Sequence, residues 1–171
     1  KTTPAEIEKA IANKLSKDPE KRSKEFEHIA HIEVQKIIDA MLKENLSFNI
    51  CTSDFICFIH KELYNRIPAE YRTIKDISGN KVNLIPGKLR DTDVKVGNHY
   101  PPSYLFITEF LERFCSSYLP EKLSGIDKII AAASSHHRLT WIHPFPDGNG
   151  RTARLFTHAY LIKAGINPKD L

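Results

Sequence analysis

A stretch near the end of the chain, IHPFPDGNGRTARLF at residues 142–156, brings together side chains that are suited to phosphate chemistry. An imidazole can accept a proton near neutral pH, a carboxylate oxygen is a hard ligand for Mg²⁺, and guanidinium groups bind phosphate oxygens. These side chains, with the small residues between them, are His143, Asp147, Gly148, Asn149, Gly150, Arg151 and Arg154. Their combination favours transfer of a group from a nucleotide phosphate to a hydroxyl.

The surrounding pattern predicts how this stretch is held. Two prolines in HPFP predict an extended loop, followed by a helix that begins around Asn149 and runs to Gly165. Residues 147–151 should therefore lie at a helix N-terminus, where unpaired backbone N–H groups and the helix dipole attract an anion. Gly148 and Gly150 would let a phosphate approach the backbone without a Cβ in the way.

The charged side chains around this cradle suggest separate roles. Arg151 and Arg154 are three residues apart on one side of the first helical turn, which suits a di- or triphosphate. Asp147 could cap the helix or bind Mg²⁺, and the several phosphates expected nearby favour the metal. His143 precedes it by four residues and could take a proton from an incoming hydroxyl.

The segment from His143 to Arg154 resembles the signature HPFx(D/E)GNGRxxR of the Fic family, with every specified position filled. The resemblance extends through HHRLTWIHPF and GKLRDTDVKVGNHYPP and covers roughly residues 50–165. It implies a mainly α, single-domain helical bundle with a small β-hairpin flap inserted.

The resemblance also implies a reaction, the transfer of AMP from ATP to a Ser, Thr or Tyr hydroxyl of a target protein with release of pyrophosphate. It implies that His143 is the general base, that Asp147 binds Mg²⁺ and that Phe145 anchors the loop in the core. The remaining motif residues are implied to bind phosphates: Gly148, Asn149 and Gly150 around the α- and β-phosphates, Arg151 and Arg154 at the β- and γ-phosphates.

The family's targets are implied to dock on the flap as an added strand, here along TDVKVGN at residues 92–98. The docking residues would be Asp93, Val94, Lys95, Val96 and Gly97.

Two other functions stay open on the sequence. The same site could remove AMP from a protein or move another nucleotide or phosphorylated group. Alternatively the chain could be a non-catalytic nucleotide-sensing or partner-binding module. The GNGR form favours nucleotidyl transfer, and the intact His143 argues against a pure binder.

Self-inhibition in this family depends on a helix with the pattern (S/T)xxxE(G/N), whose glutamate pairs with the second arginine of the motif. Ser23–His28 supplies the serine and Glu27 but ends in histidine, and the segment around Glu33 lacks the serine and the glycine. Neither segment matches the full pattern, so self-inhibition by this chain is left open, and both glutamates are interpreted as ordinary helix-surface acids. A separate inhibitor or an N-terminal regulatory segment is left open as a partner.

Apolar spacing predicts the helices that must position the motif. We expect an N-terminal helical region at 1–45, trimmed because the chain lacks an initial Met, and a Fic core at 46–171 with the flap at about 76–100 and the motif at 143–154. Helices are predicted over residues 4–15, 26–42, 55–63, 105–114, 124–141 and 149–165. The charged run SKDPEKRSKE is interpreted as a solvated connection, and VNL with VKV as the strands of the hairpin.

Several single residues are assigned to the packed interior. Phe55, Phe58, Leu105, Phe106, Phe110 and Phe114 are predicted core, as is a face of the central helix with Ile126, Ile129, Ile130, Ala133, His137, Thr140 and Trp141. We expect structural roles for His28, His31, His60, His99 and His158, and no metal cluster from His136, His137 and His143.

Composition narrows the remaining choices. A net charge of +4 is well short of a nucleic-acid-binding signature, and no apolar run reaches the length of a membrane span. The three cysteines have no metal-binding spacing, which indicates reduced thiols and favours the cytoplasm.

Overall fold

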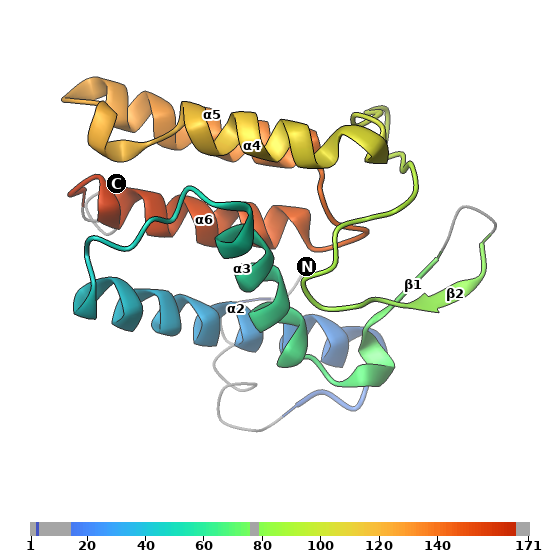
Figure 1. Ribbon diagram of the computed structural model, residues 1–171. Helices are drawn as coiled ribbons and strands as arrows, with labels where there is room; N and C mark the ends of the chain where they lie inside the picture. Colours follow the sequence, from blue (N-terminus) through green and yellow to red (C-terminus); the bar gives the residue numbers. More distant parts are fainter. Residues whose placement is uncertain (1–2, 4–14, 76–78, 167–171) are drawn as a thin grey trace.

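The computed structural model describes residues 3, 15–75 and 79–166, which form a mainly helical bundle with one small antiparallel sheet (Figure 1). The long elements are α2 (Pro19–Glu44), α3 (Ser53–Asn65), α4 (Ile107–Ser117), α5 (Ile126–Ile142) and α6 (Asn149–Lys163). The short ones are η1 (Ala69–Tyr71), β1 (Thr73–Lys75), β2 (Lys81–Asn83), η2 (Tyr104–Phe106) and η3 (Pro120–Lys122). The predicted fold class is confirmed. The helix predicted over 4–15 lies, apart from its last residue, outside the described residues, and the division at residue 45 stays a prediction.

Helix α6 lies at the centre of the bundle, with α5 and α4 on one side and α2 on the other, while α3 contacts both α2 and α6 (Figure 1). The side chains of Leu155, Phe156 and Tyr160 are fully buried around it. Because three helices pack on α6, its N-terminus is held in a fixed position relative to all of them.

Helix α2 begins earlier than predicted. Asp18 accepts hydrogen bonds from two backbone N–H groups of the first turn, and Pro19 occupies the first helical position, so most of the charged run is helix. The interpretation of this run as a connection was wrong because its high charge hid the N-cap signal. Glu25 within it is 5% exposed and accepts a 2.8 Å hydrogen bond from the Ser16 backbone N–H.

The central helix α5 buries a different face from the predicted one. Ile126, Ile129 and Ile130 are 67%, 41% and 56% exposed, and Ala133 and His137 are exposed as well. The buried residues of α5 are Ala131, Ala132, Ser135, Leu139 and Ile142. Small side chains on this face let α5 approach α6 closely. The packing gained in this way outweighs the gain from burying the isoleucine side chains.

The strand that contains Val82 pairs with a different segment from the one predicted. β1 and β2 pair antiparallel with Thr73 opposite Asn83, Ile74 opposite Val82 and Lys75 opposite Lys81. Val82 therefore pairs with an earlier segment and not with VKV. The VKV segment forms no strand and contributes only an isolated bridge between Val96 and His99. Closing the shorter loop between β1 and β2 costs less chain entropy than the longer connection to residues 94–96.

Two residues predicted to lie in the core are on the surface. Leu105 and Phe106 are 69% and 52% exposed, because η2 directs them outward before the buried face of α4 begins at Ile107. Phe55 and Phe114 are each 2% exposed, so they confirm the prediction, and Phe58 and Phe110 are partly buried against the core.

The three cysteines are free thiols. Burial raises the pKa of Cys51 to about 12 and that of Cys115 to about 11, and it also raises the pKa of Cys57. They are therefore protonated near neutral pH and are poor nucleophiles. Among the described residues, no helix combines the length and the apolarity that crossing a membrane requires. A cytoplasmic location stays a prediction.

Candidate active site

His143 directly follows α5 as its C-cap and lies where the chain turns toward α6. It adopts a left-handed conformation with φ 53°, and its backbone N–H donates to the Leu139 carbonyl at 3.1 Å. Its Nδ1 lies 3.2 Å from the Thr140 carbonyl oxygen, which selects the tautomer that carries its proton on Nδ1. Burial lowers the pKa of His143. The imidazole is therefore neutral near pH 7, with Nε2 available to accept a proton.

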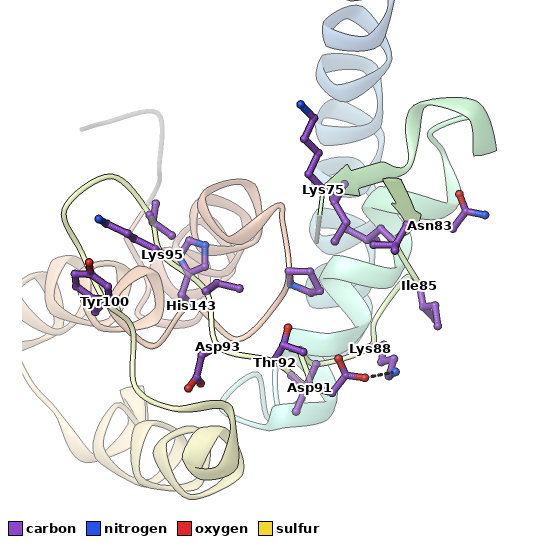
Figure 2. Close-up of a pocket in the computed structure, with 17 residues that line it drawn as sticks. Lys75, Asn83, Ile85, Lys88, Asp91, Thr92, Asp93, Lys95, Tyr100 and His143 are labelled. Carbon is purple, nitrogen blue, oxygen red and sulfur yellow. Dashed lines mark hydrogen bonds and ion pairs between the residues drawn. The ribbon is translucent and has the colours of Figure 1, made fainter. Parts of the chain in front are cut away.

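The imidazole faces a cavity of about 710 Å³. Pro146 of the motif and the segment from Asp91 to Val96 also line this cavity, and the β1–β2 hairpin closes it on the opposite side (Figure 2). Of the predicted docking residues, Asp93, Val94, Lys95 and Val96 line it, while Gly97 lies just beyond with φ 59°. The general base and the docking segment predicted from the sequence thus share one cavity.

Phe145 and Asn149 hold the shape of the loop. Phe145 is fully buried, its backbone N–H donates to Asn149 Oδ1 at 2.9 Å, and its carbonyl accepts from Asn149 Nδ2 at 2.7 Å. Both ends of the Asn149 amide thus hold the loop, and Asn149 is 3% exposed, so its side chain has a structural role here.

The N-terminus of α6 carries open amides. Gly148 is its N-cap with φ 77° and has no side-chain capping hydrogen bond. Within the described part of the chain, no acceptor binds the backbone N–H groups of Asn149, Gly150 or Arg151. These groups lie at the positive end of the helix dipole and are suited to bind an anion, while the anion cradle expected from the sequence stays a prediction. The alternative that Asp147 caps this helix is wrong.

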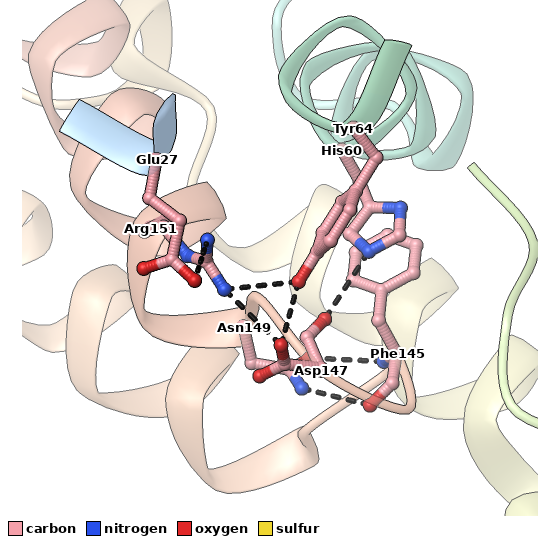
Figure 3. A network of polar contacts seen from close by, with 7 residues as sticks. All are labelled: Glu27, His60, Tyr64, Phe145, Asp147, Asn149 and Arg151. Atoms are coloured by element: carbon pink, nitrogen blue, oxygen red, sulfur yellow. Dashed lines mark hydrogen bonds and ion pairs between the residues drawn. The ribbon is translucent and has the colours of Figure 1, made fainter. Parts of the chain in front are cut away.

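The Asp147 carboxylate is half-exposed at the edge of the cradle. Its Oδ2 accepts hydrogen bonds from Tyr64 Oη at 2.8 Å and from Arg151 Nη2 at 3.1 Å (Figure 3). Within the described residues its Oδ1 has no partner, so a hard oxygen is left for a cation beside the open amides.

The two arginines of the motif are in different environments. Arg151 is 14% exposed, forms an ion pair of 3.1 Å with Glu27 of α2, and donates from Nη2 to Tyr64 Oη at 2.9 Å (Figure 3). Arg154 is exposed, and no hydrogen bond or ion pair holds its guanidinium within the described residues. The interpretation of Glu27 as an ordinary surface acid is therefore wrong. Its contact is with the first arginine of the motif.

The chain is similar to the members of a known protein family. Residues 50–161 match the model of the Fic/DOC family. The chain belongs to the Fic/DOC family. Protein adenylyltransferase Fic from Nematostella vectensis is 39% identical over 92 residues, which are 54% of this chain and 22% of that protein. Protein adenylyltransferase fic-1 from Caenorhabditis elegans is 37% identical over 92 residues, 54% of this chain and 18% of that protein. The chain thus spans about a fifth of the length of these curated relatives.

Solved Fic structures have the same fold. Fic-1 from C. elegans superposes with a TM-score of 0.71 at 20% sequence identity, covering 97% of this chain and 44% of that chain. A Fic domain containing signaling protein from Bacteroides thetaiotaomicron gives a TM-score of 0.65 at 20% identity, covering 95% of this chain and 57% of that chain.

Two residues of α3 support the Fic motif: His60, for which the sequence predicted a structural role, and Tyr64, which it left unassigned. His60 Nδ1 accepts from the Gly87 backbone N–H at 2.8 Å, so Nε2 carries the proton and donates to the Asp147 carbonyl at 3.1 Å. Its ring stacks on Phe145 with centroids 3.9 Å apart and lies 4.7 Å from the ring of Tyr64. Their i, i+4 spacing on an otherwise apolar face was the available signal. Burial lowers the pKa of His60 to about 4 and raises that of Tyr64.

Arg90 joins the base of the Fic flap to the motif and was also missed. Its side chain is 1% exposed, and Nε donates to the His143 carbonyl at 2.8 Å while Nη1 donates to the Thr92 carbonyl at 2.9 Å. Its backbone N–H donates to the Pro144 carbonyl at 2.9 Å. A buried guanidinium with several carbonyl acceptors fixes the flap relative to His143.

Proposed function

We propose that this chain transfers AMP from ATP to a Ser, Thr or Tyr hydroxyl of a target protein and releases pyrophosphate. The observation that carries the proposal is the position of His143. A neutral imidazole faces a cavity shared with the flap and lies one short loop before the open amides of α6. A nucleotide-binding module without catalysis would need the cradle but not this base.

The proposed reaction uses the chain's own groups as follows. Nε2 of His143 accepts the proton of the target hydroxyl, and the hydroxyl oxygen attacks the α-phosphorus of ATP. The bond from that phosphorus to the bridging oxygen breaks, and pyrophosphate leaves with the electron pair. The backbone N–H groups at the start of α6 stabilise the phosphate charge, and the exposed Arg154 binds the terminal phosphates.

Asp147 is proposed as the protein ligand of Mg²⁺. The fit is supported by a half-exposed carboxylate at the mouth of the cradle, with one oxygen unpartnered among the described residues. Bound Mg²⁺ would supply positive charge that neutralises the phosphate oxygens of the nucleotide.

The flap is proposed to bind the target as an added strand. Within the described residues, the backbones of Val94 and Lys95 make no hydrogen bond, so their N–H and C=O groups are free for an extended segment. Asp93 is less suited to bind the target, since its carboxylate accepts from the Tyr104 backbone N–H at 2.8 Å.

Glu27 is proposed to restrain the site. While it pairs with Arg151, this guanidinium is held between Glu27 of α2 and Asp147. Productive binding of ATP then requires that this pair separates, so α2 would act as the regulatory segment.

The test is label transfer from α-labelled ATP in the presence of Mg²⁺ and a cell lysate. The native chain should label a protein, and His143→Ala should bind ATP with unchanged affinity in calorimetry but transfer no label. Absence of transfer by the native chain and by a Glu27→Gly variant would rule out the proposed reaction.

A further inference from the structure

The β1–β2 hairpin and the flap face one another across the cavity that contains His143. Figure 2 shows Lys95, Tyr100 and His143 on one side and Lys75, Asn83 and Ile85 of the hairpin region on the other. The flap was the only docking element expected from the sequence. The hairpin is a second wall, and the mechanism above gives it no role.

The hairpin wall is apolar and partly exposed. Ile74 and Val82 are directly opposite one another in the two strands, so their side chains lie on the same face of the hairpin. Val82 is 38% exposed, Ile85 57% and, on the flap, Val96 42%, while Leu84 beneath them is 4% exposed. Single exposed apolar residues are common, but several gathered around one cavity indicate a binding surface.

The wall is fixed to the bundle. The Leu84 backbone N–H donates to the Arg72 carbonyl at 2.7 Å, and Arg72 donates from Nη2 to the Asn65 carbonyl and from Nε to the Ile67 carbonyl at the end of α3. The base of the hairpin is thus tied to the same helix whose His60 and Tyr64 support the motif loop. Its distance from His143 is therefore set by α3, which allows it to select a side chain at a defined place along a bound segment.

The chemistry of the cavity points to a polypeptide occupant. Its volume of about 710 Å³ is far larger than one hydroxyl-bearing side chain needs and lies in the usual range for ligand sites. The backbone of Val94 and Lys95, which makes no hydrogen bond to the described residues, suits an extended chain, and the proposed role of His143 requires that the occupant bring a hydroxyl to Nε2.

We propose that the target's segment runs between the flap and the hairpin and that a large aliphatic or aromatic residue next to the modified hydroxyl packs against Ile74 and Val82. The inference rests on the proposed function for the identity of the hydroxyl. The hairpin then determines which targets are accepted, while the motif determines the reaction.

The experiment uses fluorescent peptides with a central Thr, Ser or Tyr in which each flanking position carries in turn Leu, Phe, Ala, Glu or Lys. Binding to the full chain with His143→Ala is measured by anisotropy, and modification by the native chain is measured with α-labelled ATP. Val82→Lys is compared with Ile126→Lys, a matched change at a residue of α5 that is 67% exposed. Circular dichroism and thermal unfolding verify that both variants fold, and Val82→Ala serves as a second variant.

We expect Leu or Phe at one flanking position to bind about tenfold or more tightly than Ala, as burial of one such side chain predicts. Val82→Lys should shift this preference to Glu, Val82→Ala should weaken it, and Ile126→Lys should leave it unchanged. A flat profile at every position, or the same profile in both Val82 variants and the native chain, would overturn the inference. Since binding is read without catalysis, peptides that bind with this preference but receive no label would contradict the proposed function and leave the inference standing.

Discussion

The hydroxyl of Tyr64 on α3 donates a hydrogen bond of 2.8 Å to Oδ2 of Asp147, 83 residues further along the chain. The same hydroxyl accepts from Arg151 Nη2 at 2.9 Å, and the guanidinium lies over the Tyr64 ring at 5.3 Å from its centroid. One phenol thus orients the proposed metal ligand and the first arginine of the motif together. Glu27 joins the same group of side chains through Arg151, which connects α2 to the proposed metal ligand Asp147.

Tyr64→Phe should weaken Mg·ATP binding while the fold is kept. The change removes both hydrogen bonds of the hydroxyl and should lower the free energy of unfolding by about 1–3 kcal/mol. Asp147 and Arg151 lose their common partner, so we expect the Mg²⁺ concentration for half-maximal ATP binding in calorimetry to rise. Tyr160→Phe is the matched control, because the buried Tyr160 hydroxyl has no partner within the described residues and its loss should leave Mg·ATP binding unaltered. Equal effects of the two changes would show that Tyr64 contributes only packing.

Glu27→Gln should increase ATP affinity. The neutral amide no longer holds Arg151 by charge, and loss of about 1.4 kcal/mol of restraint corresponds to roughly tenfold tighter binding. Glu33→Gln is the matched control, since Glu33 lies on the same helix but pairs at 3.3 Å with Arg66, outside the motif. Titration with a non-hydrolysable ATP analogue measures the affinity of both variants for the nucleotide. An affinity that stays the same in Glu27→Gln would disprove the restraint.

The pH dependence of label transfer should report His143. Burial lowers its pKa from the ordinary value of 6.5, so more than half of the imidazole is neutral at pH 6.5 and the protonated form dominates only at lower pH. The logarithm of kcat/KM should therefore be flat near neutral pH and fall with a slope of one on the acid side, with a midpoint below 6.5. A midpoint above 6.5 would be inconsistent with His143 as the base.

Gly148→Ala should destabilise the motif. Gly148 has φ 77°, and a Cβ there would lie 2.6 Å from Cε2 of Tyr64. Gly165→Ala isolates the cost of the conformation, because Gly165 has φ 75° but no atom within 4 Å of its Cβ position. In urea unfolding, we expect Gly165→Ala to lower the free energy of unfolding by about 1–2 kcal/mol and Gly148→Ala to lower it clearly more. Similar losses would mean that the Tyr64 ring moves aside at little cost.

Local signals in the sequence predicted local structure well. Thr52, a polar residue just before the helix predicted over 55–63, caps α3 by accepting from the Phe55 backbone N–H at 3.1 Å, and the glycines and prolines of the motif placed the start of α6 at Asn149. Both depend on residues within one helical turn. The contiguous motif likewise supplied the candidates for base, cradle and metal ligand.

Features that depend on distant segments could not be predicted in this way. The buried face of α5 was decided by small residues that fit against α6, and the strand opposite Val82 by loop closure. The contacts of Tyr64 with Asp147 and of Glu27 with Arg151 join segments that no local pattern relates. Tertiary packing overrode single-segment periodicity in each case.

The stability of the fold should decrease on mild acidification because of its buried histidines. Burial lowers the pKa of His60 to about 4, and burial together with the neighbouring Arg154 lowers that of His31 to about 4. Below pH 6.5 the unfolded chain takes up protons that the folded chain refuses until about pH 4. The free energy of unfolding should therefore decrease between these two values, with His60 contributing up to about 3 kcal/mol. Urea unfolding across this pH range measures the slope of the free energy of unfolding against pH.

His60→Gln should flatten that slope. A glutamine keeps a donor for the Asp147 carbonyl but cannot be protonated, so the pH dependence due to His60 disappears even if the variant is less stable at pH 7. His137→Gln, a change at an exposed residue of α5, is the control and should preserve the native slope. An unchanged slope in His60→Gln would mean that His60 takes up its proton equally in the folded and unfolded chain. The His60 ring would then not be held neutral in the folded chain. The tautomer that donates from Nε2 to the Asp147 carbonyl would lose its support.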